Sequence, residues 1–191
     1  MRKFMIMPAI VAGVLASNGA IAQPAPKPQM QMRIDAPVKI ANPYGAYEFL
    51  IGDWYTKPTG GPDLRFHQQF SWGTEKGSIK YTTLTTVGPA PEAVHFEGLL
   101  VWNGATKLVD YIIVTEPGSG GQEKGTLHAE ADGAIVRDVL LTRADGKTST
   151  FQQRFWRENG ALFMSMMRKT DKGWEPNFPG SERLAMSPTP V

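Results

Sequence analysis

Two polar residues close together in the chain are the first candidates for chemistry. His95 and Glu97 are separated by one residue, so on a β-strand their side chains share a face about 7 Å apart. An imidazole beside a carboxylate is half of an acid–base or metal site. We favour the simpler interpretation, an exposed polar pair at the start of a strand.

A second candidate pair is separated by many residues. Asp110 and Arg137 each alternate with aliphatic residues, a pattern that places both in an apolar interior. A buried carboxylate needs a partner, so the hypothesis is that the two side chains pair inside the fold and contact a polar group of a ligand. The favoured alternative turns this face outward and puts Tyr111 and Ile113 inside.

Eight further side chains are predicted to bind a ligand because alternation places them on inward faces. They come from three strand-like segments, and they either line a cavity or fill a core. They are Phe66, Gln68, Phe70, Trp72, Tyr81, Phe151, Gln153 and Phe155.

The remaining metal and redox chemistry is limited by composition. The chain has three histidines and no cysteine, which excludes disulfides, thiolate metal sites and cysteine nucleophiles. By alternation His67 and His128 are expected to face solvent, so no three histidines converge and no metal site is expected.

Charge argues against a polyanionic partner. The formal net charge is +2, but Arg2 and Lys3 are the only charged residues among the first 22, and the rest of the chain has 18 basic and 18 acidic residues. A balanced chain lacks the positive field that binds nucleic acid or anionic lipid. We expect no nucleic-acid partner.

The N-terminus is typical of a secretory signal peptide. Arg2 and Lys3 precede an apolar stretch of about a dozen residues, and Ala20-Ile21-Ala22 fits the small-residue cleavage pattern. The stretch is shorter than the roughly 20 residues that span a bilayer, so no stable membrane anchor is expected. Cleavage after Ala22 would place the protein in the periplasm or outside the cell.

The chain therefore divides into a signal peptide (1–22), a proline-rich extended linker (23–43), one folded domain (44–187) and a short tail (188–191). The linker has five prolines and no clear hydrophobic period. Residues 44–51 are the one short helical candidate, and that helix is expected to end at Gly52.

The folded domain is predicted to be all-β. Turn dipeptides such as Asn103-Gly104, Asp132-Gly133 and Asn159-Gly160 recur about every 13 to 15 residues, leaving strands of about ten residues. Regular hairpins predict an antiparallel up-and-down meander of about ten strands. An open sheet of this size has two bare edges, so a closed β-barrel is expected.

Residues 49–54, Phe-Leu-Ile-Gly-Asp-Trp, resemble the entry motif of calycin-type barrels, the lipocalins and nitrobindin-like proteins. The resemblance implies that a helical turn closes one barrel mouth, Gly52 lets the chain bend into the first strand, and Trp54 plugs the core. It also implies a basic residue over Trp54, for which Arg168 and Arg183 are candidates. Nitrobindin-like barrels hold haem through a late histidine, but the last one here is His128, so no cofactor is expected.

These patterns favour a secreted or periplasmic barrel that binds a small, largely apolar molecule in its interior. One alternative is an isomerase, cyclase or hydratase on the same scaffold, using the polar candidates above. Another is an envelope interaction module with a filled barrel. Residues 99–102 and 112–114 are apolar on both faces, so the N-terminal arm or a second copy, as in a homodimer, is expected to cover them.

Overall fold

A run of antiparallel hairpins makes up the part of the chain that the computed structural model describes, residues 42–57, 63–116 and 118–191. The predicted signal peptide and nearly all of the predicted linker lie outside these residues. The elements in chain order are η1 (Gly45–Leu50), β1 (Gly52–Thr56), β2 (Leu64–Trp72), η2 (Thr74–Lys76), β3 (Ile79–Val87), β4 (Ala93–Asn103), β5 (Leu108–Thr115), β6 (Gly121–Ala129), β7 (Ile135–Thr142), β8 (Thr148–Glu158), β9 (Ala161–Thr170), β10 (Gly173–Pro176) and β11 (Leu184–Met186).

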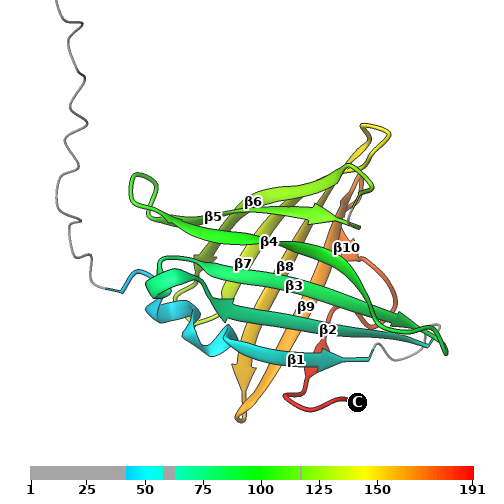
Figure 1. Cartoon of the computed structure of the whole chain (residues 1–191), viewed down its shortest axis with the longest axis horizontal. Coiled ribbons are helices and arrows are strands. Elements are labelled where there is room, and N and C mark those ends of the chain that lie inside the picture. Colours follow the sequence, from blue (N-terminus) through cyan, green and yellow to red (C-terminus); the bar gives the residue numbers. More distant parts are fainter. Residues whose placement is uncertain (1–41, 58–62, 117) are drawn as a thin grey trace, which may run out of the picture. The chain divides into compact units, whose positions relative to one another are not determined.

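Each strand from β1 to β10 pairs with the next one in the chain, so the sheet is a meander (Figure 1). The turns lie where the glycine dipeptides predicted them. At the tightest, Glu158 pairs with Ala161, and Asn159 and Gly160 both have positive φ, at 51° and 83°. This is the two-residue turn whose twist matches the strands it joins. The prediction of an all-β antiparallel meander is confirmed.

The ten strands form an open half-barrel that curls through 221°. The sheet is thus less closed than the predicted barrel. The C-terminal strand β11 pairs with β9 and reaches toward β1. There Tyr55 N donates to Ser187 O at 2.7 Å, and Ser187 N donates to Tyr55 O at 2.8 Å. This short bridge protects part of the two edges that the curled sheet leaves open.

The helical turn η1 packs into one end of the inner face, and Figure 1 shows it in cyan beside the ends of the strands. Tyr44, Tyr47 and Leu50 are buried. The Tyr44 hydroxyl donates to Gly77 O at 3.0 Å and accepts from Trp102 N at 2.7 Å. The Tyr47 hydroxyl donates to Leu127 O at 3.2 Å, so two tyrosines tie this turn to three separate places in the sheet region.

Gly52 and Trp54 lie at the start of β1, as the entry motif predicts. Gly52 has φ 138°, in the region that favours glycine. Trp54 is half-buried against the core, and its indole Nε1 donates to Leu50 O at 2.7 Å. Arg183 does not cover Trp54. Its guanidinium lies 4.0 Å from the ring centre of Phe163 and 5.8 Å from that of Trp156.

The centre of the sheet depends on a glycine where β4 and β5 approach closely. Gly98 pairs with Ile113, and a Cβ built on Gly98 would lie 2.1 Å from Ile112 O and 2.7 Å from Ile113 Cα. Both atoms belong to the backbone, so a side chain at this position must push the strands apart.

We expect Gly98→Ala to destabilise the protein by about 1–3 kcal/mol through this overlap. Gly104→Ala is the matched control, because a Cβ at this position would meet nothing within 4 Å and the φ of Gly104 is ordinary. Chemical denaturation of the two variants measures the difference. Equal stabilities would contradict the close approach of β4 and β5.

Candidate functional site

The inner face of the half-barrel has three layers along the strands. The end next to η1 is tightly packed: Phe70 lies edge-on to Phe155 with ring centres 6.0 Å apart, and Tyr44 contacts Trp72 in the same way at 5.9 Å. A layer of buried polar side chains follows. Beyond it lies a cavity of about 370 Å³.

The cavity is lined mostly by apolar side chains from β2, β3, β4, β7, β8 and β9. Phe178, in the segment after β10, also lines it, and its ring lies 6.1 Å from that of Phe66. This segment is held by Ser181, which is fully buried and donates to Met166 O at 2.8 Å. The principal apolar lining residues are Leu64, Phe66, Phe96, Leu141, Phe151 and Phe178.

An ion pair forms the centre of the polar layer. Arg137 on β7 pairs through Nη2 with Glu123 Oε2 on β6, and its Nη1 donates to Gln153 Oε1 on β8 at 2.7 Å. Both charged residues are buried, with 4% of Arg137 and 8% of Glu123 exposed. Three consecutive strands are therefore joined through their side chains on the inner face.

Two tyrosine rings contact the guanidinium of Arg137, which lies 4.5 Å from the ring centre of Tyr111 and 5.0 Å from that of Tyr81. Burial disfavours the charged guanidinium, but Glu123 and the two tyrosines more than offset this effect and raise the pKa of Arg137. The group stays positively charged. The negative ring faces and the carboxylate supply the compensation that a buried cation requires.

A second, smaller cavity of about 30 Å³ lies within the polar layer. It shares Phe66, Phe96, Glu123, Gln153 and Met166 with the larger cavity, so the two adjoin. Its other lining residues are Gln68, Tyr81, Thr83, Arg137 and Met164. The floor of the apolar cavity is thus a small polar recess with room for a group the size of a water molecule.

The eight side chains predicted to bind a ligand divide among the three layers. Phe66, Phe151 and Gln153 line the large cavity, and Gln68 and Tyr81 line the recess. The other three, Phe70, Trp72 and Phe155, pack in the core near η1. The structure therefore brings five of the eight to the cavities.

Asp110 and Arg137 do not meet, and the predicted pairing is wrong. Asp110 lies on the outer face with Ile112, which is 59% exposed, and it accepts a hydrogen bond from Asn103 Nδ2 at 2.6 Å. Tyr111 and Ile113 point inward and are buried, as the favoured alternative predicted. Arg137 is inside, but its carboxylate partner is Glu123.

His95 and Glu97 lie apart because β4 has a register shift opposite Thr83 and Leu84. Phe96 pairs with Thr83 and Val94 pairs with Leu84, so His95, which lies between them on β4, has no partner on β3. His95 lies at the rim of the cavity with its Nδ1 3.4 Å from Glu116 Oε1, whereas Glu97 is exposed on the sheet surface.

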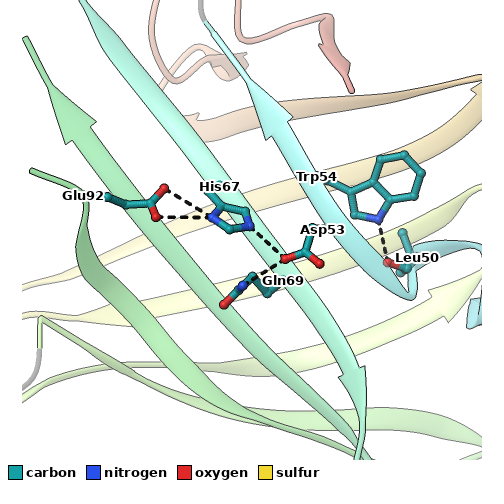
Figure 2. A network of polar contacts seen from close by, with 6 residues as sticks. All are labelled: Leu50, Asp53, Trp54, His67, Gln69 and Glu92. Carbon is teal, nitrogen blue, oxygen red and sulfur yellow. Dashed lines mark hydrogen bonds and ion pairs between the residues drawn. The ribbon is translucent and has the colours of Figure 1, made fainter. Parts of the chain in front are cut away.

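His67 was expected to face solvent, and this prediction is wrong because the residue is 8% exposed. Figure 2 shows its ring between two carboxylates: Nε2 lies 2.9 Å from Asp53 Oδ1, and Nδ1 lies 3.2 Å from Glu92 Oε1. Tyr55 stacks on it with ring centres 4.1 Å apart. Hydrogen bonds from Gln69 and His67 lower the pKa of Asp53.

This network on the outer face ties β1 and β2 to the loop before β4. Both imidazole nitrogens contact carboxylates, so neither is free to take a proton from a substrate. Among the described residues, no group of three or more His, Asp or Glu side chains is arranged to hold a metal ion. The polar layer and its cavity are therefore the stronger candidate site.

Glu123 and Tyr111 in the polar layer were not assigned to a site by sequence reasoning, and neither were Phe96 and Phe178 of the cavity lining. A signal existed for Glu123, since it shares the strand parity of Leu127, which is fully buried. Opposite Tyr111 stands Gly125, where a Cβ would lie 3.1 Å from the Tyr111 hydroxyl oxygen. The missing side chain leaves room for this tyrosine hydroxyl.

Comparisons add no assignment to this geometry: no protein-family model matches the chain, and no curated protein matches it. In the described ranges, no helix has the length and apolar character needed to cross a bilayer.

The contribution of Tyr111 to the stability of the fold has a testable pH dependence. Burial raises the pKa of Tyr111 from 10.0 to about 12, although Arg137 opposes the shift. The neutral phenol therefore stabilises the fold fully below pH 10, and this contribution is lost as pH rises toward about 12. The pKa values of Tyr81 and Tyr47 are raised by burial as well.

We expect Tyr111→Phe to lower stability at neutral pH by roughly 1 kcal/mol, because the hydroxyl donates to Asp138 O. The variant should lose less stability than the wild type between pH 10 and about 12. Denaturation curves across this range make the comparison. Parallel declines in both proteins would show that Tyr111 is not buried.

Proposed function

We propose that the protein binds a small, largely apolar molecule inside the half-barrel. The observation that carries this proposal is the apolar cavity of about 370 Å³ with a polar floor. Its volume lies within the range of about 300–1,000 Å³ that is usual for small-molecule pockets. Four phenylalanines contribute to its lining, and Met166 adds an adaptable side chain.

The floor supports binding more than catalysis. Arg137 and Glu123 already neutralise each other, and burial raises the pKa values of Tyr81 and Tyr111 further above neutral pH. The candidate acid–base pairs are separated, and His67 has both nitrogens engaged. An isomerase, cyclase or hydratase would need a proton-transfer group at the cavity wall, for which His95 at the rim, with its Nδ1 3.4 Å from Glu116 Oε1, is the candidate.

We also infer a calycin-like barrel in the periplasm or outside the cell. A short helical turn leading into Gly-x-Trp, followed by ten meandering strands, supports the calycin-like interpretation. The apolar N-terminal stretch with its small-residue cleavage pattern supports export. A small apolar molecule crossing an aqueous compartment needs such a protected interior.

Binding in the cavity is tested by placing a larger side chain in its lining. Leu141→Trp adds an indole to a half-buried residue of the lining, and Leu140→Trp adds the same group one position away on the outer face. Fluorescence titration with the neutral apolar dye N-phenylnaphthylamine should show one site. We expect at least a tenfold loss of affinity for Leu141→Trp, as a rough estimate of the lost contact area.

The control Leu140→Trp should bind the dye as the wild type does. Absence of binding to the wild-type protein would overturn the proposed function. An equal loss in both variants would place the dye outside the cavity.

A second candidate function, self-association, is favoured by the outer face. Leu99, Val101, Ile112 and Val114 from neighbouring strands β4 and β5 are 44–59% exposed and form a contiguous apolar patch, the outer patch. Its neighbours across the strands include two basic residues, Lys80 and Lys124, and two acidic ones, Glu97 and Asp110. A patch bordered by both charges can pair with a second copy of itself.

We expect the wild-type protein to elute as a homodimer in size-exclusion chromatography with light scattering. Ile112→Lys should yield monomers, because it places a charge at the centre of the outer patch. Val191→Lys, at an exposed valine in the tail, is the control and should leave the dimer intact. A monomeric wild type would refute self-association without affecting the cavity.

A further inference from the structure

The recess at the floor of the cavity contains buried polar atoms without partners. Gln68 is 2% exposed and Arg137 is 4% exposed, and both line the recess. Gln68 Oε1 and Arg137 Nε form no hydrogen bond with any described residue. A buried polar atom left in this way costs about 1–3 kcal/mol, so both atoms favour an occupant that can bond to them.

The neighbouring hydrogen bonds define what kind of occupant is missing. The amide nitrogen of Gln68 is directed to Met164 Sδ at 3.3 Å, which leaves its oxygen as an acceptor. Arg137 donates from Nη1 to Gln153 and from Nη2 to Glu123, and its Nε–H has no acceptor among the described residues. Glu123 Oε2 receives Arg137, while Oε1 accepts no hydrogen bond from the described residues.

A hydroxyl is a small polar group that meets these demands. A hydroxyl donates one hydrogen bond and accepts others, so it can serve an acceptor such as Gln68 Oε1 and the donor Arg137 Nε together. An ether or ketone has no hydrogen to donate. An ammonium cannot accept from Arg137, and a carboxylate would lie beside the Glu123 carboxylate with no proton to share.

Size points the same way. The recess of about 30 Å³ is small but has room for a group the size of a water molecule, so it admits a hydroxyl. Because the recess adjoins the larger cavity, a chain or ring system in the cavity can place its terminal hydroxyl there.

We propose that the ligand is an uncharged alcohol whose apolar body occupies the large cavity and whose hydroxyl sits in the recess between Gln68, Arg137 and Glu123. This inference rests on the proposed function and specifies its ligand class.

The test compares octyl compounds that differ in the head group, each displacing N-phenylnaphthylamine from the full chain. Octanol should bind more tightly than octyl methyl ether, octanoic acid and octylamine by roughly tenfold or more, the factor expected for hydrogen bonds to otherwise unpartnered groups. Equal affinities of octanol and its methyl ether would overturn the inference while leaving the proposed function standing. Failure of the dye itself to bind would overturn the proposed function.

Two variants test whether Gln68 is responsible for the preference for octanol over its methyl ether. Gln68→Leu removes the unpartnered oxygen without leaving a polar group behind, so the fold should be retained, and the preference for octanol over its ether should fall toward unity. Gln69→Leu, the outward neighbour on β2, should keep the wild-type preference. An unchanged preference in a folded Gln68→Leu protein would place the hydroxyl outside the recess. If that variant does not fold, the comparison of the four octyl compounds on the wild-type protein tests the inference.

Discussion

The ion pair between Arg137 and Glu123 is the constraint around which the interior is organised. Charges removed from water are tolerated only when other groups replace the lost hydration. Here the replacement comes from Gln153 and from the faces of Tyr81 and Tyr111. These side chains must come from several strands at one level of the sheet. Together with Gln153 the pair joins β6, β7 and β8, and the tyrosines of β3 and β5 contact it at the same level.

The same constraint explains why one end of the interior is packed and the other is not. Next to η1, aromatic rings interdigitate and Tyr44 and Tyr47 seal the end with hydrogen bonds to the backbone. The polar layer cannot be filled by simple apolar packing, because its groups need specific partners. Beyond it lies the cavity, whose walls are mostly apolar. The proposed ligand, an apolar molecule with one hydroxyl, would complete both regions.

Local patterns in the chain were sufficient for the meander and for part of the site. Turn dipeptides located the hairpins, and alternation correctly turned Phe66, Gln68, Phe151 and Gln153 inward. Alternation alone could not choose the inner face of β5, because Ile112 and Val114 on one side are as apolar as Tyr111 and Ile113 on the other. That ambiguity led to Asp110 as the partner of Arg137 in place of Glu123.

Two other errors have nonlocal causes. The register shift in β4 separates His95 from Glu97, and no residue pattern in the strand announces it. His67 is covered by Tyr55 from β1 and Glu92 from the loop before β4, so its burial depends on contacts between segments up to 25 residues apart. The curl of 221° is likewise a property of the whole sheet, whereas regular hairpins are equally compatible with a closed barrel.

A double-mutant cycle on the central pair is the most direct measurement of this account. Glu123→Leu and Arg137→Met each leave one charge buried without its partner, which should cost about 3–5 kcal/mol. Replacing both removes the unpaired charge, so the double variant is predicted to be more stable than either single variant. If the losses in the free energy of unfolding of the two single variants simply add in the double variant, the two side chains do not interact, and the account is contradicted.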